Sequence, residues 1–233
     1  MKLAVMQPYF FPYIGYWQLI QAVDKFIAYD DVNYIMRGWV NRNRILINGV
    51  PAWITIPLQQ ATQNKRICET VLQKSAWRDK LLRTLEVTYR RSPHFADFFP
   101  VLKRVICFPV ANLAEYLVNQ LRVVSAYLGI RTEITVSNHR YGNHALSGQS
   151  RILDICQQEG ADTYVNLPGG RALYDESVFS EKGVHLRFLE PVFVAYSQQC
   201  PVFTPGMSLV DILMREGVDE VKRVHLASYS LSG

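Results

Sequence analysis

The stretch LAVMQPYFFPYIGYWQLIQAVDKFIAYDD, residues 3–31, decides the fold of this 233-residue chain. Its apolar opening, Leu3 to Met6, predicts a buried strand. Residues 14–23 predict a helix, and the run KFIAYDD from Lys25 predicts a second strand. Two strands joined through a helix form a β-α-β unit, which is expected to be parallel and right-handed.

Polar residues that follow these two strands are expected at one edge of the sheet. Ligands collect beyond the carboxyl ends of parallel strands, so the turn after Met6 and the pair Asp30 and Asp31 should face one crevice. Neighbouring strand residues point to opposite faces, so both carboxylates serve one site only if the chain turns there. Asp30 is expected to contact substrate and Asp31 to act as a base. The alternative is a solvated acidic turn.

Beyond residue 31 the patterns predict a hairpin, several helices and further strands. Asn48-Gly49 separates RILI from VPAWITI, and this dipeptide favours a hairpin turn because it accepts positive φ at both positions. Helices are expected from the N-cap Ser75 to the C-cap Gly129, and again after the N-cap Ser208. Strands are expected at RTEITVS, TYVN and KGVHLRFLEP, whereas the last residues, SYSLSG, are expected to fray.

The fold class is therefore α/β, with a mostly parallel sheet flanked by helices, a β-hairpin insertion and a helical middle segment. We expect a single domain over residues 1–233. Two lobes are the alternative, with residues 1–58 and 131–217 forming the sheet and residues 75–130 the helical part. A hydrophobic content of 49% supports a sizeable core, and 19% charged residues excludes a disordered chain.

Composition narrows the class of partner. The net charge of +5 favours an anionic partner, namely a nucleotide, a phosphate or an anionic surface, and it is too modest to argue for nucleic acid as a specific target. The four cysteines form no CxxC pair, so neither a zinc site nor a redox pair is expected. No signal peptide is evident and no run approaches the roughly 20 apolar residues that span a bilayer, so a cytoplasmic protein without membrane insertion is expected. The motifs identify no cofactor, metal or oligomeric state.

The turn after the first strand resembles, in outline, the histidine-x-glycine-histidine turn of nucleotidylyltransferases. Gly15 is present, but Tyr13 and Tyr16 stand where the histidines would be. A tyrosine has a pKa of about 10, so at pH 7 it donates a hydrogen bond to a phosphate without supplying positive charge. Nucleotidyl or adenylyl transfer is one alternative for this turn, and an aromatic plug over the core is another. Gln7 and Tyr16 are the polar contacts expected for a substrate.

The run RGWVNRNR, residues 37–44, is the strongest candidate for binding an anion. Arginine forms bidentate bonds to phosphate and carboxylate groups, and the intervening amides can read hydroxyls and carbonyls. Arg37, Asn41 and Arg42 are the expected contacts, and Arg42 and Arg44 would share one face of an extended strand. A solvated hairpin is the alternative.

Two loops that follow later strands complete the candidates. SNHRYGNH contains His139 and His144, and His139 is the preferred general base because imidazole titrates near neutrality. TYVNLPGGRALYD supplies Tyr164 as a substrate contact, and the free amides of Gly169 and Gly170 suit an anion at the start of a short helix. This run contains neither GxGxxG nor the P-loop pattern, so an ordinary turn is the alternative.

Taken together, these segments resemble the WbqC-like family from Leu3 to about Gly217. The matching motifs, in order, are QPYFFPYIGYWQLI, YDDVNY, RGWVNRNRI, WITIPL, SRILDIC, GADTYVNLPGGRALYD and FTPGMSLVDILMREG. The resemblance implies a component of bacterial surface-polysaccharide gene clusters, especially O-antigen clusters. It also implies a role in making or decorating a nucleotide-linked sugar, often an amino sugar that carries an acyl or aminoacyl group. Arg215 and Glu216 depart from the small or amide residues expected in the last motif.

The leading hypothesis is a cytoplasmic transferase that moves an acyl or aminoacyl group from a donor onto the amino group of a nucleotide-activated sugar. This chemistry needs a base and a stabiliser for the oxyanion. The expected residues are His139 or Asp31 as base, Tyr16, Gln7 or the Gly169 and Gly170 amides as charge stabilisers, and Arg37, Arg42 and Arg151 as ligands of phosphate or carboxylate. A non-catalytic nucleotide-sugar-binding or assembly protein is a third hypothesis, beside nucleotidyl transfer.

Overall fold

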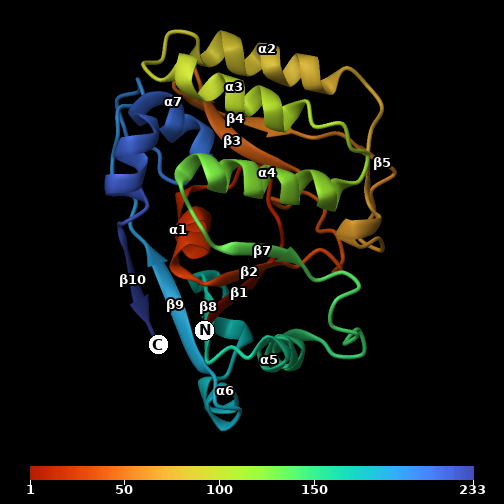
Figure 1. The fold of residues 1–233 in the computed structure, drawn as a ribbon. Coiled ribbons are helices and arrows are strands. Elements are labelled where there is room, and N and C mark those ends of the chain that lie inside the picture. The colour runs from red at the N-terminus through yellow and green to blue at the C-terminus, as the bar shows by residue number, and fades with distance from the viewer.

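The computed structural model describes residues 1–233, and its centre is a six-stranded sheet with the order β10-β9-β8-β1-β2-β7 (Figure 1). The strands are β1 (Lys2–Met6), β2 (Lys25–Ala28), β7 (Glu133–Val136), β8 (Thr163–Asn166), β9 (His185–Pro191) and β10 (Tyr229–Ser232). All neighbouring strands pair in parallel except β9 and β10, which are antiparallel. The α/β class with a mostly parallel sheet is confirmed.

Helices cover both faces of the sheet (Figure 1). The α-helices are α1 (Ile14–Ala22), α2 (Trp77–Tyr89), α3 (Phe95–Ile106), α4 (Leu113–Leu128), α5 (Gly148–Glu159), α6 (Glu176–Glu181) and α7 (Leu209–Glu220). The shorter helical turns are η1 (Ile67–Glu69), η2 (Pro168–Leu173) and η3 (Val221–His225). No helix is both long and apolar enough to cross a bilayer.

Strand alternation divides the core between the two faces. In β1, Leu3 and Val5 pack with α5 and α6 in the smaller core, whereas Ala4 faces the larger core. The larger core extends from the sheet through α1 and the hairpin into α2, α3, α4 and α7. The helical middle segment is thus present as expected and shares a core with one face of the sheet, while the division into lobes stays a prediction.

The order of the strands creates a topological switch beside β1. The chain runs from β1 through α1 to β2 on one side, and β8 pairs with β1 on the other side. The helix after β1 packs in the larger core, whereas α6 after β8 packs in the smaller one. Connections that leave in opposite directions open a crevice beyond the carboxyl ends of the two strands.

The chain also forms three antiparallel strand pairs, of which the sequence predicted only one. The hairpin β3 (Arg42–Ile47) and β4 (Val50–Thr55) turns at Asn48 and Gly49, whose φ values of 52° and 76° confirm the expected turn. A second pair, β5 (Leu58–Gln59) and β6 (Val71–Leu72), had no clear signal in the sequence. The frayed tail is wrong, because residues 229–232 form β10 along β9.

The helix ends test three capping residues that the sequence predicted. Gly129 ends α4 with a φ of 71°, and the Ser208 side chain accepts a hydrogen bond from the Val210 amide, so both expected caps are confirmed. The N-cap at Ser75 is wrong, because α2 begins at Trp77 and its N-cap residue Ala76 makes no side-chain cap. Trp77, the first residue of this helix, packs in the larger core.

Candidate functional site

A cavity of about 630 Å³ occupies the crevice at the switch between β1 and β8. From β1 and the turn after it come Val5, Met6, Gln7, Tyr9 and Tyr13, and from the end of β8 come Asn166, Leu167, Pro168, Gly169, Gly170, Leu173 and Tyr174. The remaining lining residues are Tyr29, Ile35, Trp39, Gly148 and Ile152. Ligand sites of α/β proteins lie in this position, so the expected crevice exists.

A second cavity of about 270 Å³ continues this crevice along the opening turn. The two cavities share Tyr9, Tyr13 and Trp39, and the second adds Asn43, Arg44, Phe193 and Gly206. We call the two cavities together the switch-point groove. Its lining is rich in aromatic rings and amide groups and contains one arginine.

The backbone of the opening turn, residues 7–13, is held by buried side chains from three distant elements. Asn43 donates to the Phe10 and Phe11 carbonyls at 3.0 and 2.9 Å. Gln120 of α4 accepts from the Phe11 amide and donates to the Tyr9 carbonyl, both at 3.0 Å. Ser208 donates to the Phe11 carbonyl at 2.7 Å. The turn is therefore both an aromatic plug, through its buried phenylalanines, and a fixed groove wall, through its exposed side.

Tyr16 supports this wall from below. It is fully buried, and its hydroxyl donates to the Gln7 carbonyl at 2.7 Å. Burial raises the pKa of Tyr16 well above its ordinary value, so the hydroxyl stays a neutral donor. Gln7 itself lines the groove, and its side-chain oxygen is buried without a hydrogen-bond partner.

The end of β8 forms the opposite wall, where the Gly169 and Gly170 backbone lines the groove as expected. A Cβ atom on Gly170 would lie 2.6 Å from the Asn166 side-chain nitrogen, so only glycine leaves Asn166 its position. Asn166 in turn accepts from the Leu167 amide at 2.7 Å. Tyr164 lies beneath this wall, fully buried against Phe179, and is not part of the lining.

The acidic pair after β2 converges on one hydroxyl, because the chain turns there. Ser137 Oγ lies 3.1 Å from the Asp30 carboxylate and 2.5 Å from the Asp31 carboxylate. Asp30 also accepts from the Asn138 amide at 2.9 Å. Burial raises the pKa of Asp30, and hydrogen bonds from Asn138 and Ser137 offset this shift in part. Both carboxylates are buried, and neither lines the switch-point groove.

Arg151 of α5 completes a buried polar cluster with Asp31. Its guanidinium donates to Asp31 at 2.5 Å and to Asn143 at 2.9 Å, and it lies 4.8 Å from the centre of the Tyr29 ring. Asn143 donates onward to Asp154 at 2.7 Å. Arg151 was expected to hold a phosphate or carboxylate of the substrate. Its side chain is instead only 6% exposed and is bound to Asp31 and Asn143 inside the protein, and its ring contact places it behind the groove residue Tyr29.

The two loop histidines lie on different sides of this cluster. His139 is exposed and lines a separate cavity of about 530 Å³ together with Asp30, Cys68 and Arg122. His144 Nδ1 lies 3.4 Å from the Asp31 carboxylate. The structure therefore pairs His139 with the Asp30 cavity, and it is His144 that contacts Asp31.

The arginine-rich run is arranged differently from the expectation. Arg42 donates to the main-chain carbonyls of Arg37 and Gly38, the latter at 3.2 Å, and stacks 4.1 Å from the Trp53 ring centre. Asn41 is buried, accepting from Tyr34 at 2.7 Å and donating to Ile56 at 2.8 Å. Arg37, Asn41 and Arg42 therefore do not line the groove, whereas Arg44 does.

Sequence reasoning missed most of the aromatic lining and the polar support. Tyr9, Trp39, Tyr174 and Phe193 line the groove, and Asn166 does so from the last position of β8. The available signal for Asn166 was its place at the carboxyl end of a strand beside β1. No short-range signal marked Phe193, which reaches the groove from the segment after β9.

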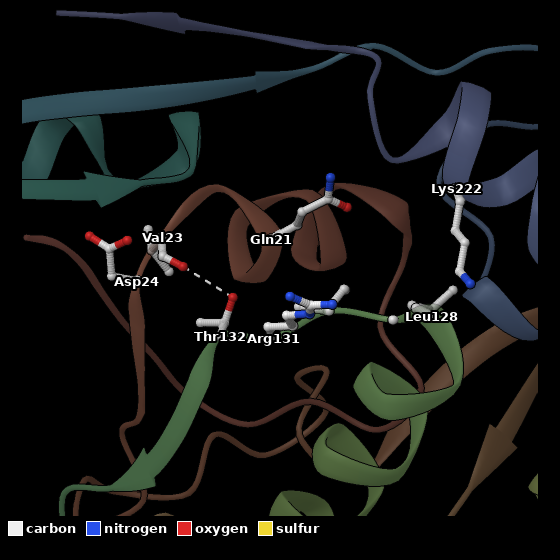
Figure 2. Close-up of a pocket in the computed structure, with 9 residues that line it drawn as sticks. Gln21, Val23, Asp24, Leu128, Arg131, Thr132 and Lys222 are labelled. Carbon is white, nitrogen blue, oxygen red and sulfur yellow. Dashed lines mark hydrogen bonds between the residues drawn. The ribbon is translucent and has the colours of Figure 1, made fainter.

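A further cavity of about 620 Å³ lies at the opposite edge of the sheet, at the amino ends of β2 and β7. Figure 2 shows it between Gln21 of α1 and Lys222, with the Thr132 hydroxyl donating to the Val23 carbonyl at 3.0 Å. Strand amino ends rarely bind substrates in parallel sheets, so the switch-point groove is the better candidate. No three His, Cys, Asp or Glu side chains lie together as a metal site would require.

Comparison with known proteins agrees with the motifs. The profile of the WbqC-like protein family matches residues 7–223. A protein of Mycobacterium tuberculosis with the name Uncharacterized protein Rv1507c is 32% identical over 222 residues, which cover 94% of this chain and 95% of the relative. No solved structure matches the chain. The match over nearly the whole length shows that the chain belongs to the WbqC-like protein family.

Proposed function

We propose that this protein binds a nucleotide-activated amino sugar in the switch-point groove and transfers an acyl or aminoacyl group to its amine during bacterial surface-polysaccharide (O-antigen) biosynthesis. The observation that carries the proposal is the composition of the groove, which joins aromatic rings, amide side chains and one arginine at the carboxyl ends of β1 and β8. The resemblance to the WbqC-like family implies this substrate class.

The lining suits a nucleotide sugar in size and chemistry. The larger cavity, of about 630 Å³, falls in the range of small-molecule sites, and the smaller one, of about 270 Å³, shares three lining residues with it and extends the space for a ligand. Aromatic rings such as Tyr9 and Trp39 offer faces for a sugar or a nucleobase. Gln7 and Asn166 offer amides for hydroxyl and acyl groups, and tyrosine hydroxyls add neutral donors. This mixture fits a ligand that is partly apolar, rich in hydroxyls and anionic at one end.

The transfer step needs a base within reach of the sugar amine. The sugar amine would attack the acyl carbonyl carbon, the acyl–donor bond would break, and the amine proton would pass to a base. Neither a carboxylate nor an imidazole lines the groove. Asp30 and His139 line a neighbouring cavity, and the segment from Tyr29 to Asp31 contributes residues to both cavities. Catalysis by either residue therefore requires the sugar amine to reach past this segment.

This same absence of a base from the lining favours a second candidate, a non-catalytic nucleotide-sugar-binding protein of the polysaccharide machinery. Nucleotidyl transfer gains no support from the geometry. The hydroxyl of Tyr16 is bound to the Gln7 carbonyl inside the protein, so it does not reach a phosphate as the histidine of the related turn would.

Calorimetric titration with an amino-sugar nucleotide, followed by incubation with acyl donors and mass spectrometry of the sugar, tests the proposal. Asn166→Ala should weaken binding at least about tenfold, because a hydrogen bond to the ligand is lost. Gln21→Ala, at the opposite edge of the sheet, is the control and should bind normally. Binding without turnover would favour the non-catalytic candidate, and no binding of any nucleotide sugar would reject both.

A further inference from the structure

Arg44 occupies an unusual position on the hairpin. It pairs with Trp53 across β3 and β4, and its guanidinium lies 5.9 Å from the Trp53 ring centre and 5.5 Å from that of Trp39. Arg42 covers the same Trp53 ring, which confirms that the two arginines share one strand face. Of the two arginines, only Arg44 lines the smaller cavity of the groove.

The Arg44 guanidinium has no internal partner. Its Nε atom is buried without a hydrogen bond, and none of the ion pairs in the protein includes Arg44. No carboxylate lines the cavity that it faces. Arg42 differs, because main-chain carbonyls of the loop before β3 accept from its guanidinium. Arg44 as a whole is half-buried and lines the smaller cavity, and no hydrogen bond within the protein uses its terminal guanidinium nitrogens, so an acceptor from outside the chain is the expected partner of these nitrogens.

The backbone around Arg44 is fixed, as a binding site requires. The Arg44 amide donates to the Asn43 side chain at 2.8 Å, and the Arg44 carbonyl accepts from the Ser208 amide at 2.8 Å. Asn43 in turn holds the opening turn. The arginine is thus presented by the same buried hydrogen bonds that shape the groove wall.

We propose that Arg44 forms the anion subsite of the switch-point groove and holds the phosphate groups of a nucleoside diphosphate. A guanidinium matches phosphate oxygens in a bidentate manner, and the two tryptophan rings restrict its orientation. Tyr13 and Phe193, with ring centres 6.0 Å apart, stand beside it and offer faces on which a nucleobase stacks. This assignment rests on the proposed function, since it places the nucleotide end of the substrate in the smaller cavity and the sugar in the larger one.

The test is calorimetric titration of the intact protein with inorganic pyrophosphate, UDP and uridine. We expect pyrophosphate to bind, UDP to bind more tightly and uridine to bind most weakly. Arg44→Gln should weaken pyrophosphate and UDP binding at least about tenfold, and Arg44→Lys should recover part of the loss because it keeps the charge. Arg42→Gln is the matched control on the same strand face and should leave binding nearly unchanged. Thermal melts of each variant establish that it is folded.

The outcomes separate this subsite from the proposed function. Wild-type affinity in Arg44→Gln, an equal loss in Arg42→Gln, or no pyrophosphate binding by the wild-type protein would each overturn the subsite. If nucleotide sugars bind normally to Arg44→Gln, the subsite fails while the proposed function stands. If pyrophosphate binds through Arg44 but no nucleotide sugar binds, the subsite stands and the proposed function fails.

Discussion

The Arg151 guanidinium donates to the Asp31 carboxylate across 2.5 Å, and the two side chains are only 6% and 0% exposed. This contact joins α5 to the segment after β2 and fixes Tyr29 at the edge of the groove. A buried pair of this kind needs further hydrogen bonds, and Ser137 supplies one to Asp31 while Asn143 accepts one from Arg151. The pair therefore positions the groove wall and is not itself available to a ligand.

Replacing Arg151 by methionine should lower the free energy of unfolding by about 3–5 kcal/mol, because the Asp31 carboxylate is left buried without its cation. Urea denaturation measures this loss. Arg223→Met removes an exposed arginine whose side chain is 72% accessible, and it should change stability by less than about 0.5 kcal/mol. Similar losses in the two variants would show that the buried pair contributes no more than a surface pair.

Tyr16→Phe separates the contribution of the Tyr16 hydroxyl, which supports the opening turn, from that of its ring, which packs in the core. The phenylalanine ring keeps the packing against Phe26, whose ring centre lies 5.5 Å away, and removes only the hydrogen bond to the Gln7 carbonyl. We expect a loss of about 1 kcal/mol in the free energy of unfolding and weaker binding of the nucleotide sugar, because Gln7 is less well fixed. Denaturation and calorimetry measure the two effects.

The control for this variant is Tyr229→Phe, which removes a hydroxyl without a hydrogen-bond partner and should change neither quantity. Unchanged stability and affinity in Tyr16→Phe would mean that Tyr16 contributes only its ring to the core.

The fold was predictable where one local pattern determined one element. Short apolar runs predicted the first parallel strands, and Asn48-Gly49 predicted the hairpin turn, because the geometry of the turn depends on those two residues. The last strand was missed because residues 229–232 form β10 only through their pairing with β9, which lies about 40 residues earlier in the chain. Such pairing leaves little mark in a short polar segment.

The sequence predicted the location of the candidate site better than it predicted the residues that line it. The switch between strands located the crevice, and Gln7, Gly169 and Gly170 do line it. Arg42 could not be told apart from Arg44 by sequence, because the difference is a main-chain carbonyl at Arg37 that accepts from one guanidinium and not from the other. The site assignments themselves stay predictions until ligand binding is measured.

The two adjacent glycines of η2 provide a matched test of the β8 wall. An added Cβ at Gly170 would lie 2.6 Å from the Asn166 side-chain nitrogen, whereas one at Gly169 would meet nothing within 4 Å. Gly170→Ala should therefore displace Asn166 and weaken nucleotide-sugar binding about tenfold, and Gly169→Ala should bind normally. Calorimetry compares the two variants directly. Equal affinities would show that Asn166 does not contact the ligand.

His225 should make the stability of the protein depend on pH below neutrality. Its side chain is buried against Tyr196, with ring centres 5.8 Å apart. Burial lowers the pKa of His225 below its ordinary value of about 6.5, although Glu216 and Glu220 oppose this shift. As the pH falls below that value, the unfolded chain binds a proton that the folded chain excludes, so stability declines until the pH reaches the folded-state pKa. Thermal melts between about pH 7.5 and 5 should show a smaller decline in His225→Phe, which keeps the ring contact, and parallel curves would contradict the assignment.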